Sequence, residues 1–292
     1  MKNILLLDGY NLIYRARHAR MAMGKYSTVF NFFRSIRPLV EKFNPDVCYF
    51  VLEGRPKRRL EVSSDYKGQR VYHDDDNFNE QRRTIIRMIN DYFPFVVARH
   101  NDYECDDVIN HLANTVHTDD NVTIVSSDTD FIQSINETTQ VYSPIKKKFF
   151  DATEYDYVLW KALVDDKSDN IEGFRGIGDK TAIKILSSKD KFDEFMSVKE
   201  NKEKFDKNCF MIRFHDMTPD LNGLELYVNE SSLPHWDWQD VKNEFTSMGF
   251  SSIIGKEKSW NKYIKTFENL ERNIQHVNWN CIRSKYSKTA SS

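Results

Sequence analysis

Acidic side chains follow four short apolar runs of this sequence, close to the point where each run ends. They are Asp8 after NILLL, Glu53 after VCYFVL, the trio Glu104, Asp106 and Asp107 soon after FVVAR, and the pair Asp128 and Asp130 after VTIVSS. A fifth acidic group, Asp165, Asp166 and Asp169, follows the apolar run YDYVLWKALV. If these carboxylates meet, they repel one another, and a bound cation is the simplest way to hold them together.

The kind of side chain indicates the kind of ion. Carboxylates are typical ligands of hard divalent cations. Because few His or Cys side chains accompany these acids as possible ligands, Mg²⁺ or Mn²⁺ is favoured over Zn²⁺. Two such ions about 3.5–4 Å apart can clamp the attacking and leaving oxygens of a phosphodiester. A single Asp after a strand is usually a turn residue or a helix cap. Acids after four strands and in a fifth group favour a metal pocket instead.

A basic segment, GRPKRRLEVSSDYKGQR at 54–70, follows Glu53 and holds six Lys or Arg against two acids. By itself such a run can be a solvated loop. Beside an acidic metal site, it is suited to hold a polyanion and to offset charge on a reacting phosphate. Tyr66 or Tyr72 could stack on an unpaired base.

A glycine-containing segment, FRGIGDKTAIKIL at 174–186, lies between two helical patterns. Gly176 and Gly178 would let the backbone approach a phosphate, which a helix N-terminus and Lys180 would then face. The alternative is a tight turn between two helices.

The elements that must position these groups are short apolar strands expected at 3–7, 47–52, 95–99 and 122–127, separated by helical segments. This alternation predicts an α/β fold with a mostly parallel sheet covered by helices, whose strand ends carry the ligand site. Residues 141–150 indicate a hairpin or edge element, because Pro144 disfavours a central strand. From about residue 155 the patterns are helical, with no strand expected.

Length and composition set wider limits. The 292 residues suffice for a sizeable core, and 42 Lys and Arg against 44 Asp and Glu leave the net charge near zero. The four cysteines are far apart, which disfavours a disulfide framework or a zinc site. The apolar run near the N-terminus is too short for a signal peptide or a membrane span, so we expect a cytoplasmic protein with no membrane partner.

Taken together, these motifs resemble those of the 5′ nucleases. This family includes flap endonucleases, phage 5′-exonucleases and ribonucleases H of that type, and the 5′ nuclease domain of bacterial DNA polymerase I. The matching motifs, in family order, are LLDGYNLIYRARHA (6–19), DYKGQR (65–70), DYECDDVI (102–109), SSDTDFIQ (126–133), DDKSDNIEGFRGIGDKTA (165–182) and SMGFSSIIGK (247–256). The resemblance covers about residues 3–256. Glu53 stands where the family usually has Asp, Asp165 where Gly is common, and Glu172 where Pro is common.

The resemblance implies a PIN-like α/β nuclease core at 1–165, with a helical arch at about 54–90. It implies a helix–two-turn–helix element and C-terminal helices at 166–270. Residues 271–292 match nothing in the family and are expected to be a flexible tail. The implied activity is that of a structure-specific 5′ nuclease with two or more Mg²⁺ ions, for which Mn²⁺ is an expected substitute. It would act in replication on DNA with a 5′ flap, a nick or a single-stranded 5′ end.

The resemblance also implies residue roles. The ions are expected on Asp8, Glu53, Glu104, Asp106, Asp107, Asp128, Asp130, Asp166 and Asp169. The expected catalytic cations are Lys67, Arg70 and Arg15. The expected DNA contacts are Tyr66, Arg58, Arg59, Gly176, Gly178, Lys180 and Thr181. A K⁺ ion at the helix–two-turn–helix element, a monomeric state and, for a phage protein, a location in the host cytoplasm are further expectations.

Several alternatives stay open at the level of sequence. A phosphatase with Asp-x-Asp after its first strand is disfavoured, because Asp8-Gly9-Tyr10 lacks the second acid. A non-catalytic DNA-binding protein of the same fold should have lost acids that this chain keeps. An RNA primer, as part of an RNA–DNA hybrid, and a DNA flap remain alternative substrates, with exonucleolytic or endonucleolytic cutting. No motif supports a single-strand-binding protein or sliding clamp as partner.

Overall fold

The computed structural model describes residues 1–19, 24–70, 75–229 and 236–274. Its strands are β1 (Asn3–Asp8), β2 (Val47–Val51), β3 (Val96–His100), β4 (Asn121–Val125), β5 (Thr139–Ser143), β6 (Lys148–Phe149) and β7 (Leu224–Tyr227). The helices of the first half are α1 (Gly9–His18), α2 (Ser27–Phe43), α3 (Lys57–Val62), α4 (Asp76–Tyr92), α5 (Cys105–His111), η1 (Leu112–Val116) and η2 (Thr129–Ser134). Those of the second half are α6 (Tyr157–Val164), α7 (Asp179–Leu186), α8 (Lys189–Ser197), α9 (Lys199–Ile212), η3 (Thr218–Gly223), α10 (Trp238–Ser247), α11 (Ser251–Ile254), α12 (Glu257–Lys265) and α13 (Glu268–Ile274).

One sheet of seven strands forms the centre of the molecule, in the order β6-β5-β4-β1-β2-β3-β7. The five strands from β5 to β3 are parallel, and the two edge strands are antiparallel to their neighbours. The four predicted core strands are confirmed to within two residues. They were predictable from sequence because a strand that is buried on both faces is a continuous apolar run. Strand β2, for example, is buried at every position. The predicted edge hairpin at 141–150 is also confirmed, as β5 and β6.

A seventh strand was not expected, and the prediction of no strand after residue 155 is wrong. β7 pairs antiparallel with β3, with Ala98 opposite Leu226. Its four residues alternate between half-buried and exposed, as an edge strand does, and form no continuous apolar run. Pairing with β3 therefore defines this strand, and the local sequence pattern does not predict it.

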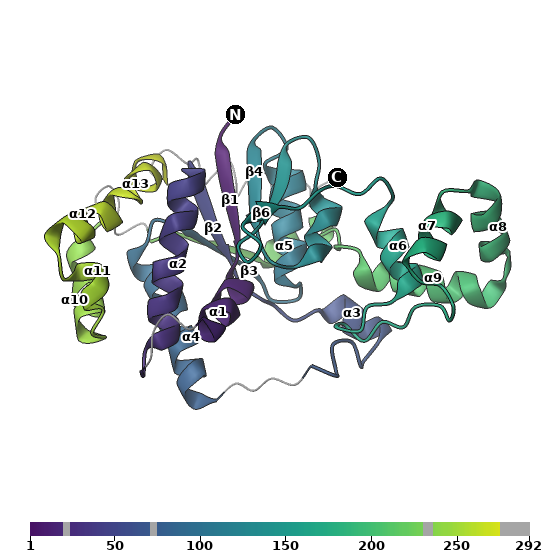
Figure 1. The fold of residues 1–292 in the computed structure, drawn as a ribbon, viewed down its shortest axis with the longest axis horizontal. Coiled ribbons are helices and arrows are strands. Elements are labelled where there is room, and N and C mark those ends of the chain that lie inside the picture. Colours follow the sequence, from purple (N-terminus) through teal and green to yellow (C-terminus); the bar gives the residue numbers. More distant parts are fainter. Residues whose placement is uncertain (20–23, 71–74, 230–235, 275–292) are drawn as a thin grey trace.

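Two hydrophobic cores divide the chain differently from the predicted boundary at residue 165. The larger core surrounds the sheet and includes the C-terminal helices, with Phe245, Trp260 and Phe267 buried in it. The smaller core joins α6 to α9 around Ala162 and Phe205. Figure 1 shows α6–α9 as a lobe on one side of the sheet and α10–α13 on the opposite side. The predicted unit 166–270 is thus split between two places.

The predicted arch at 54–90 is only partly a bridge between these regions. The short helix α3 lies between the sheet and the α6–α9 lobe (Figure 1). Helix α4, however, buries Phe78, Ile85 and Met88 in the sheet core, so it belongs to the main body. Residues 71–74, including Tyr72, lie outside the described residues.

The C-terminal end of the described chain is packed. Helix α13 buries Leu270 and Ile274 in the larger core, so the first residues of the predicted tail are ordered. The rest of that tail, 275–292, lies outside the described residues. Among the residues that the structure describes, no helix has the length and apolar character needed to cross a membrane.

Candidate metal and active site

Parallel pairing brings the first acids together at the end of the sheet where its parallel strands finish. Asp8 is the last residue of β1 and lies opposite Val51, the last residue of β2. Its neighbour Leu7 lies opposite Val125, the last residue of β4. Glu53 and Asp128 follow β2 and β4 by only a few residues, so the three acids leave the sheet at the same end.

Asp8 is both a helix cap and a candidate metal ligand. Its side chain is 6% exposed and accepts hydrogen bonds from the Asn11 backbone N–H (3.0 Å) and from Ser126 Oγ (2.8 Å). Burial raises the pKa of Asp8 to about 6 against these hydrogen bonds, and the charge of Asp128 adds to the rise. The ordinary capping role is therefore real, but it does not remove the cost of a buried charge.

Glu53 and Asp106 complete a pocket in which negative charge is unfavourable. Burial, followed by the charge of Glu104, raises the pKa of Glu53 to about 7. Asp106, in the first turn of α5, has a pKa well above its usual range because it is buried and faces Asp128 and Asp8. A bound cation would relieve both burial and repulsion, so these acids fit a hard divalent ion.

A second group of acids lies beside the first. Carboxylate oxygens of Asp130, Asp166 and Asp169 lie within 4.8 Å of one another, as ligands of one ion would. The ammonium of Lys161 forms ion pairs with Asp130 and, at 2.7 Å, with Asp166. Burial and Asp128 raise the pKa of Asp130 to about 6, whereas Lys161 overcomes burial and lowers the pKa of Asp166.

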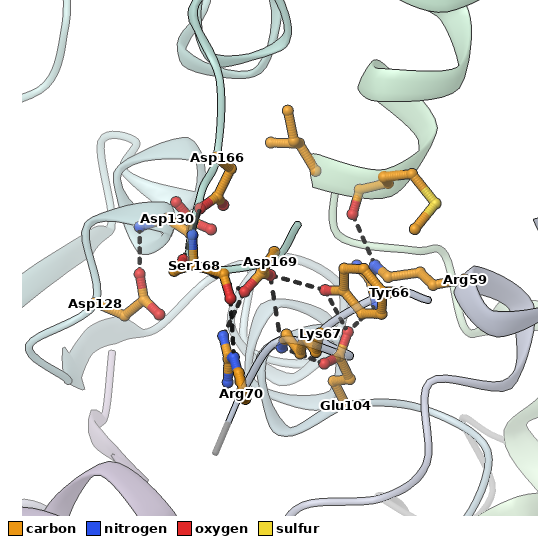
Figure 2. A network of polar contacts seen from close by, with 12 residues as sticks. Arg59, Tyr66, Lys67, Arg70, Glu104, Asp128, Asp130, Asp166, Ser168 and Asp169 are labelled. Atoms are coloured by element: carbon orange, nitrogen blue, oxygen red, sulfur yellow. Dashed lines mark hydrogen bonds and ion pairs between the residues drawn. The ribbon is translucent and has the colours of Figure 1, made fainter. Parts of the chain in front are cut away.

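The loop of Lys67 and Arg70 closes over the acids (Figure 2). Lys67 forms an ion pair with Glu104 and approaches Asp169 Oδ2 at 3.6 Å, while Arg70 also pairs with Asp169. The backbone holds this arrangement, since the Lys67 N–H donates to the Asp169 carbonyl at 3.2 Å. The structure therefore brings two of the three predicted catalytic cations, Lys67 and Arg70, to the acidic site.

Three predicted roles need correction. Arg59 is 3% exposed and pairs with Glu104 and Asp107, so its side chain is not available to DNA. Tyr66 is 6% exposed and donates its hydroxyl to Glu104 (3.1 Å) and Asp169 (2.9 Å), which excludes stacking on a base in this arrangement. Both oxygens of Asp107 accept hydrogen bonds from Arg59, so in this structure Asp107 binds Arg59 and does not act as the metal ligand that was predicted. Arg59 and Asp107 are held by opposite charge, and Tyr66 is held by hydrogen bonds to two buried carboxylates.

Two other predicted cations contact groups away from the carboxylates. Arg15 donates to the Pro144 carbonyl at 3.3 Å, beside the β5–β6 hairpin. Arg58 forms an ion pair with Asp220 at 2.7 Å and stays half exposed. Their roles toward DNA stay predictions.

The predicted phosphate-binding segment lies in the α6–α9 lobe. Gly176 has φ +82°, a conformation that favours glycine, and Gly178 is the N-cap of α7. Lys180 and Thr181, in the first turn of α7, are exposed. An anion could therefore reach this helix end.

The sequence reading missed Lys161 and Tyr157. Both lie in α6, and the Tyr157 hydroxyl donates to Asp130 at 3.2 Å. The available signal was a single Lys in the apolar run YDYVLWKALV, directly before the fifth acidic group. A lone cation in an apolar helix requires a buried anionic partner.

Sequence comparisons identify relatives of this chain. A family model described as "5'-3' exonuclease, N-terminal resolvase-like domain" matches residues 3–161. A 5'-3' exonuclease of Aquifex aeolicus is 27% identical over 248 residues, which are 78% of this chain and 83% of that protein. A DNA polymerase I of Streptococcus pneumoniae is 33% identical over 214 residues, which are 63% of this chain but only 24% of the polymerase.

Solved structures share the fold. The T5 D15 protein co-crystallised with metal ions matches with a TM-score of 0.61 and 19% identity, over 72% of this chain and 89% of that one. The bacteriophage T5 D15 flap endonuclease, in a pseudo-enzyme–product complex with DNA and metal ions, matches with a TM-score of 0.62 and 16% identity, over 92% of this chain and all of that one. At these identities the likeness concerns the fold.

Proposed function

This chain belongs to the 5'-3' exonuclease family, and on that basis we propose that it is a structure-specific, divalent-metal-dependent 5′ nuclease. Its substrate is DNA with a 5′ flap, a nick or a single-stranded 5′ end, with RNA primers in RNA–DNA hybrids as a further substrate. Mg²⁺ is the expected ion, with Mn²⁺ as a substitute. We expect the protein to act as a monomer.

The convergence of acids from separate elements carries this proposal. Asp8, Glu53 and Asp106 come from separate parts of the chain and meet beside Asp128, where burial and mutual repulsion raise the pKa of all three. A fold gains nothing from such a pocket unless a cation occupies it. Carboxylate donors without His or Cys ligands suit Mg²⁺ or Mn²⁺.

The chain's own residues then have distinct tasks. Asp8, Glu53, Glu104 and Asp106 would hold one ion, and Asp128, Asp130, Asp166 and Asp169 a second. Bound divalent ions supply a nucleophile at neutral pH and neutralise charge on the reacting phosphate. Lys67 and Arg70 lie over the acids from one loop, where they would hold and neutralise a phosphodiester. Duplex DNA would bind the exposed start of α7, where a K⁺ ion is a further expectation.

Asp128→Asn tests the proposal on a duplex with a 5′ flap labelled at its 5′ terminus. We expect wild-type protein to cut in Mg²⁺ and not in EDTA, and sizing of the labelled product to give the mode of cutting. The variant should lose cleavage and most Mn²⁺ binding by calorimetry while keeping affinity for the flap in EDTA. Asp165→Asn is the matched control, because Asp165 is adjacent in sequence to the cluster but exposed to solvent. Normal cutting by Asp128→Asn in Mg²⁺ would disprove the assignment.

A further inference from the structure

Arg59 is the buried residue of helix α3, and its guanidinium is fully hydrogen-bonded. Nη1 donates to Glu104 Oε2 (2.7 Å) and to Asp107 Oδ2 (2.7 Å), and Nη2 donates to Asp107 Oδ1 (2.9 Å). Nε donates to the Met211 carbonyl (2.9 Å) and Nη2 also to the Arg213 carbonyl (2.8 Å). These five contacts use all five N–H groups of an arginine.

The contacts of Arg59 restrict the orientation of Glu104. Arg59 and the Tyr66 hydroxyl both donate to Oε2 of Glu104, which leaves Oε1 to contact Lys67. Glu104 also acts on Glu53 across the pocket, where its charge opposes ionisation. A donor that fixes one carboxylate oxygen sets the direction in which the other oxygen points.

The same guanidinium joins three parts of the chain. Asp107 accepts the Glu104 N–H (3.2 Å) and the His215 N–H (2.8 Å) besides Arg59. Arg59 thus connects α3, at the base of the segment that carries Lys67, to the start of α5 and to residues 211–213 at the end of α9. Helix α9 belongs to the α6–α9 lobe, so the orientation of this lobe and of the Lys67 loop is linked to the orientation of Glu104.

We propose that Arg59 is a positioning residue for the metal site. It fixes the orientation of Glu104 toward the acidic pocket, and metal affinity therefore depends on how α3 and α9 pack around Arg59. The inference rests on the proposed function only for the identity of the ion. It replaces the DNA contact expected for Arg59 from sequence.

Arg59→Lys is the first test, because lysine keeps the charge but lacks the planar fork that reaches both carboxylates. Removing such a partner of a metal ligand typically lowers metal affinity about 10- to 100-fold. We expect a loss in that range for Mn²⁺ binding, measured by calorimetry without DNA, and a matching rise in the Mg²⁺ concentration for half-maximal cleavage. Cleavage should largely recover at saturating Mg²⁺, and affinity for the flap in EDTA should change less than about threefold. Lys57→Gln is the matched control, since Lys57 begins the same helix but pairs with Asp102 at the surface.

Each outcome decides the matter. Unchanged Mn²⁺ affinity in folded Arg59→Lys overturns the proposal, even if the melting temperature falls, because a purely structural role would do only that. A loss of flap affinity in EDTA as large as the loss of metal affinity also overturns it and restores a DNA contact. If Arg59→Lys does not fold, the double variant Arg59→Gln/Asp107→Asn removes both buried charges together, and the proposal requires weak Mn²⁺ binding there. A wild-type protein that binds Mn²⁺ but does not cut would refute the proposed function and leave this test intact.

Discussion

Lowering the pH from 8 to 6 should sharply weaken divalent-ion binding to the metal-free protein. With a pKa of about 7, Glu53 is about nine-tenths ionised at pH 8 and about one-tenth at pH 6. With a pKa of about 6, Asp8 falls from almost full ionisation to about half. If the first ion needs both carboxylates, the competent fraction falls from about 0.9 to about 0.05, which is about 20-fold in affinity.

Calorimetric titration of Mn²⁺ into EDTA-treated protein at pH 8, 7 and 6 measures this effect. In Glu53→Gln, whose overall affinity is weaker, the pH effect should be smaller than in the wild type, because the carboxylate with a pKa of about 7 is gone while Asp8 and Asp106 still bind protons. A wild-type affinity that changes by less than about threefold between pH 8 and pH 6 would refute the reasoning.

The same groups predict a second, opposite pH effect on stability. Their folded pKa values lie above the ordinary carboxyl values, so the folded metal-free protein binds more protons than the unfolded chain between about pH 4 and 7. Their contribution to stability is therefore complete below about pH 4 and is lost as the pH rises through 6 to 7. Melting curves in EDTA should show this trend at these sites, and saturating Mn²⁺ should reverse it at pH 8.

Three further variants test other parts of the site. Lys67→Ala should lower the single-turnover rate about 100-fold and flap affinity much less, whereas equal losses would make Lys67 a simple phosphate anchor. Glu53→Gln, measured in EDTA at pH 8, should stabilise the protein by on the order of 2–3 kcal/mol, because the neutral amide avoids the buried charge; a destabilised variant in urea unfolding would contradict this. Gly54→Ala should destabilise by more than about 2 kcal/mol in the same assay, because its Cβ would lie 1.9 Å from the His100 carbonyl oxygen, and a change under about 0.5 kcal/mol would contradict that packing.

The sequence by itself determined the parallel core strands of the sheet and most of the acidic site. Core strands buried on both faces must be continuous apolar runs, and parallel strands must end at one edge, so the positions of Asp8, Glu53 and Asp128 follow from chain order alone. The motif that carries Lys67 and Arg70 also placed two cations correctly beside the acids.

Only the tertiary structure decided which charged groups serve the site and which serve the fold. Arg58 and Arg59 are adjacent in sequence, yet one pairs with Asp220 at the surface while the other is buried against Glu104 and Asp107. The local sequence cannot predict which of the two arginines is buried, because the hydrogen-bond acceptors of Arg59 lie 45 to 154 positions away in the chain. The burial of a charge, and therefore its pKa and its role, depends on what packs around it from distant parts of the chain.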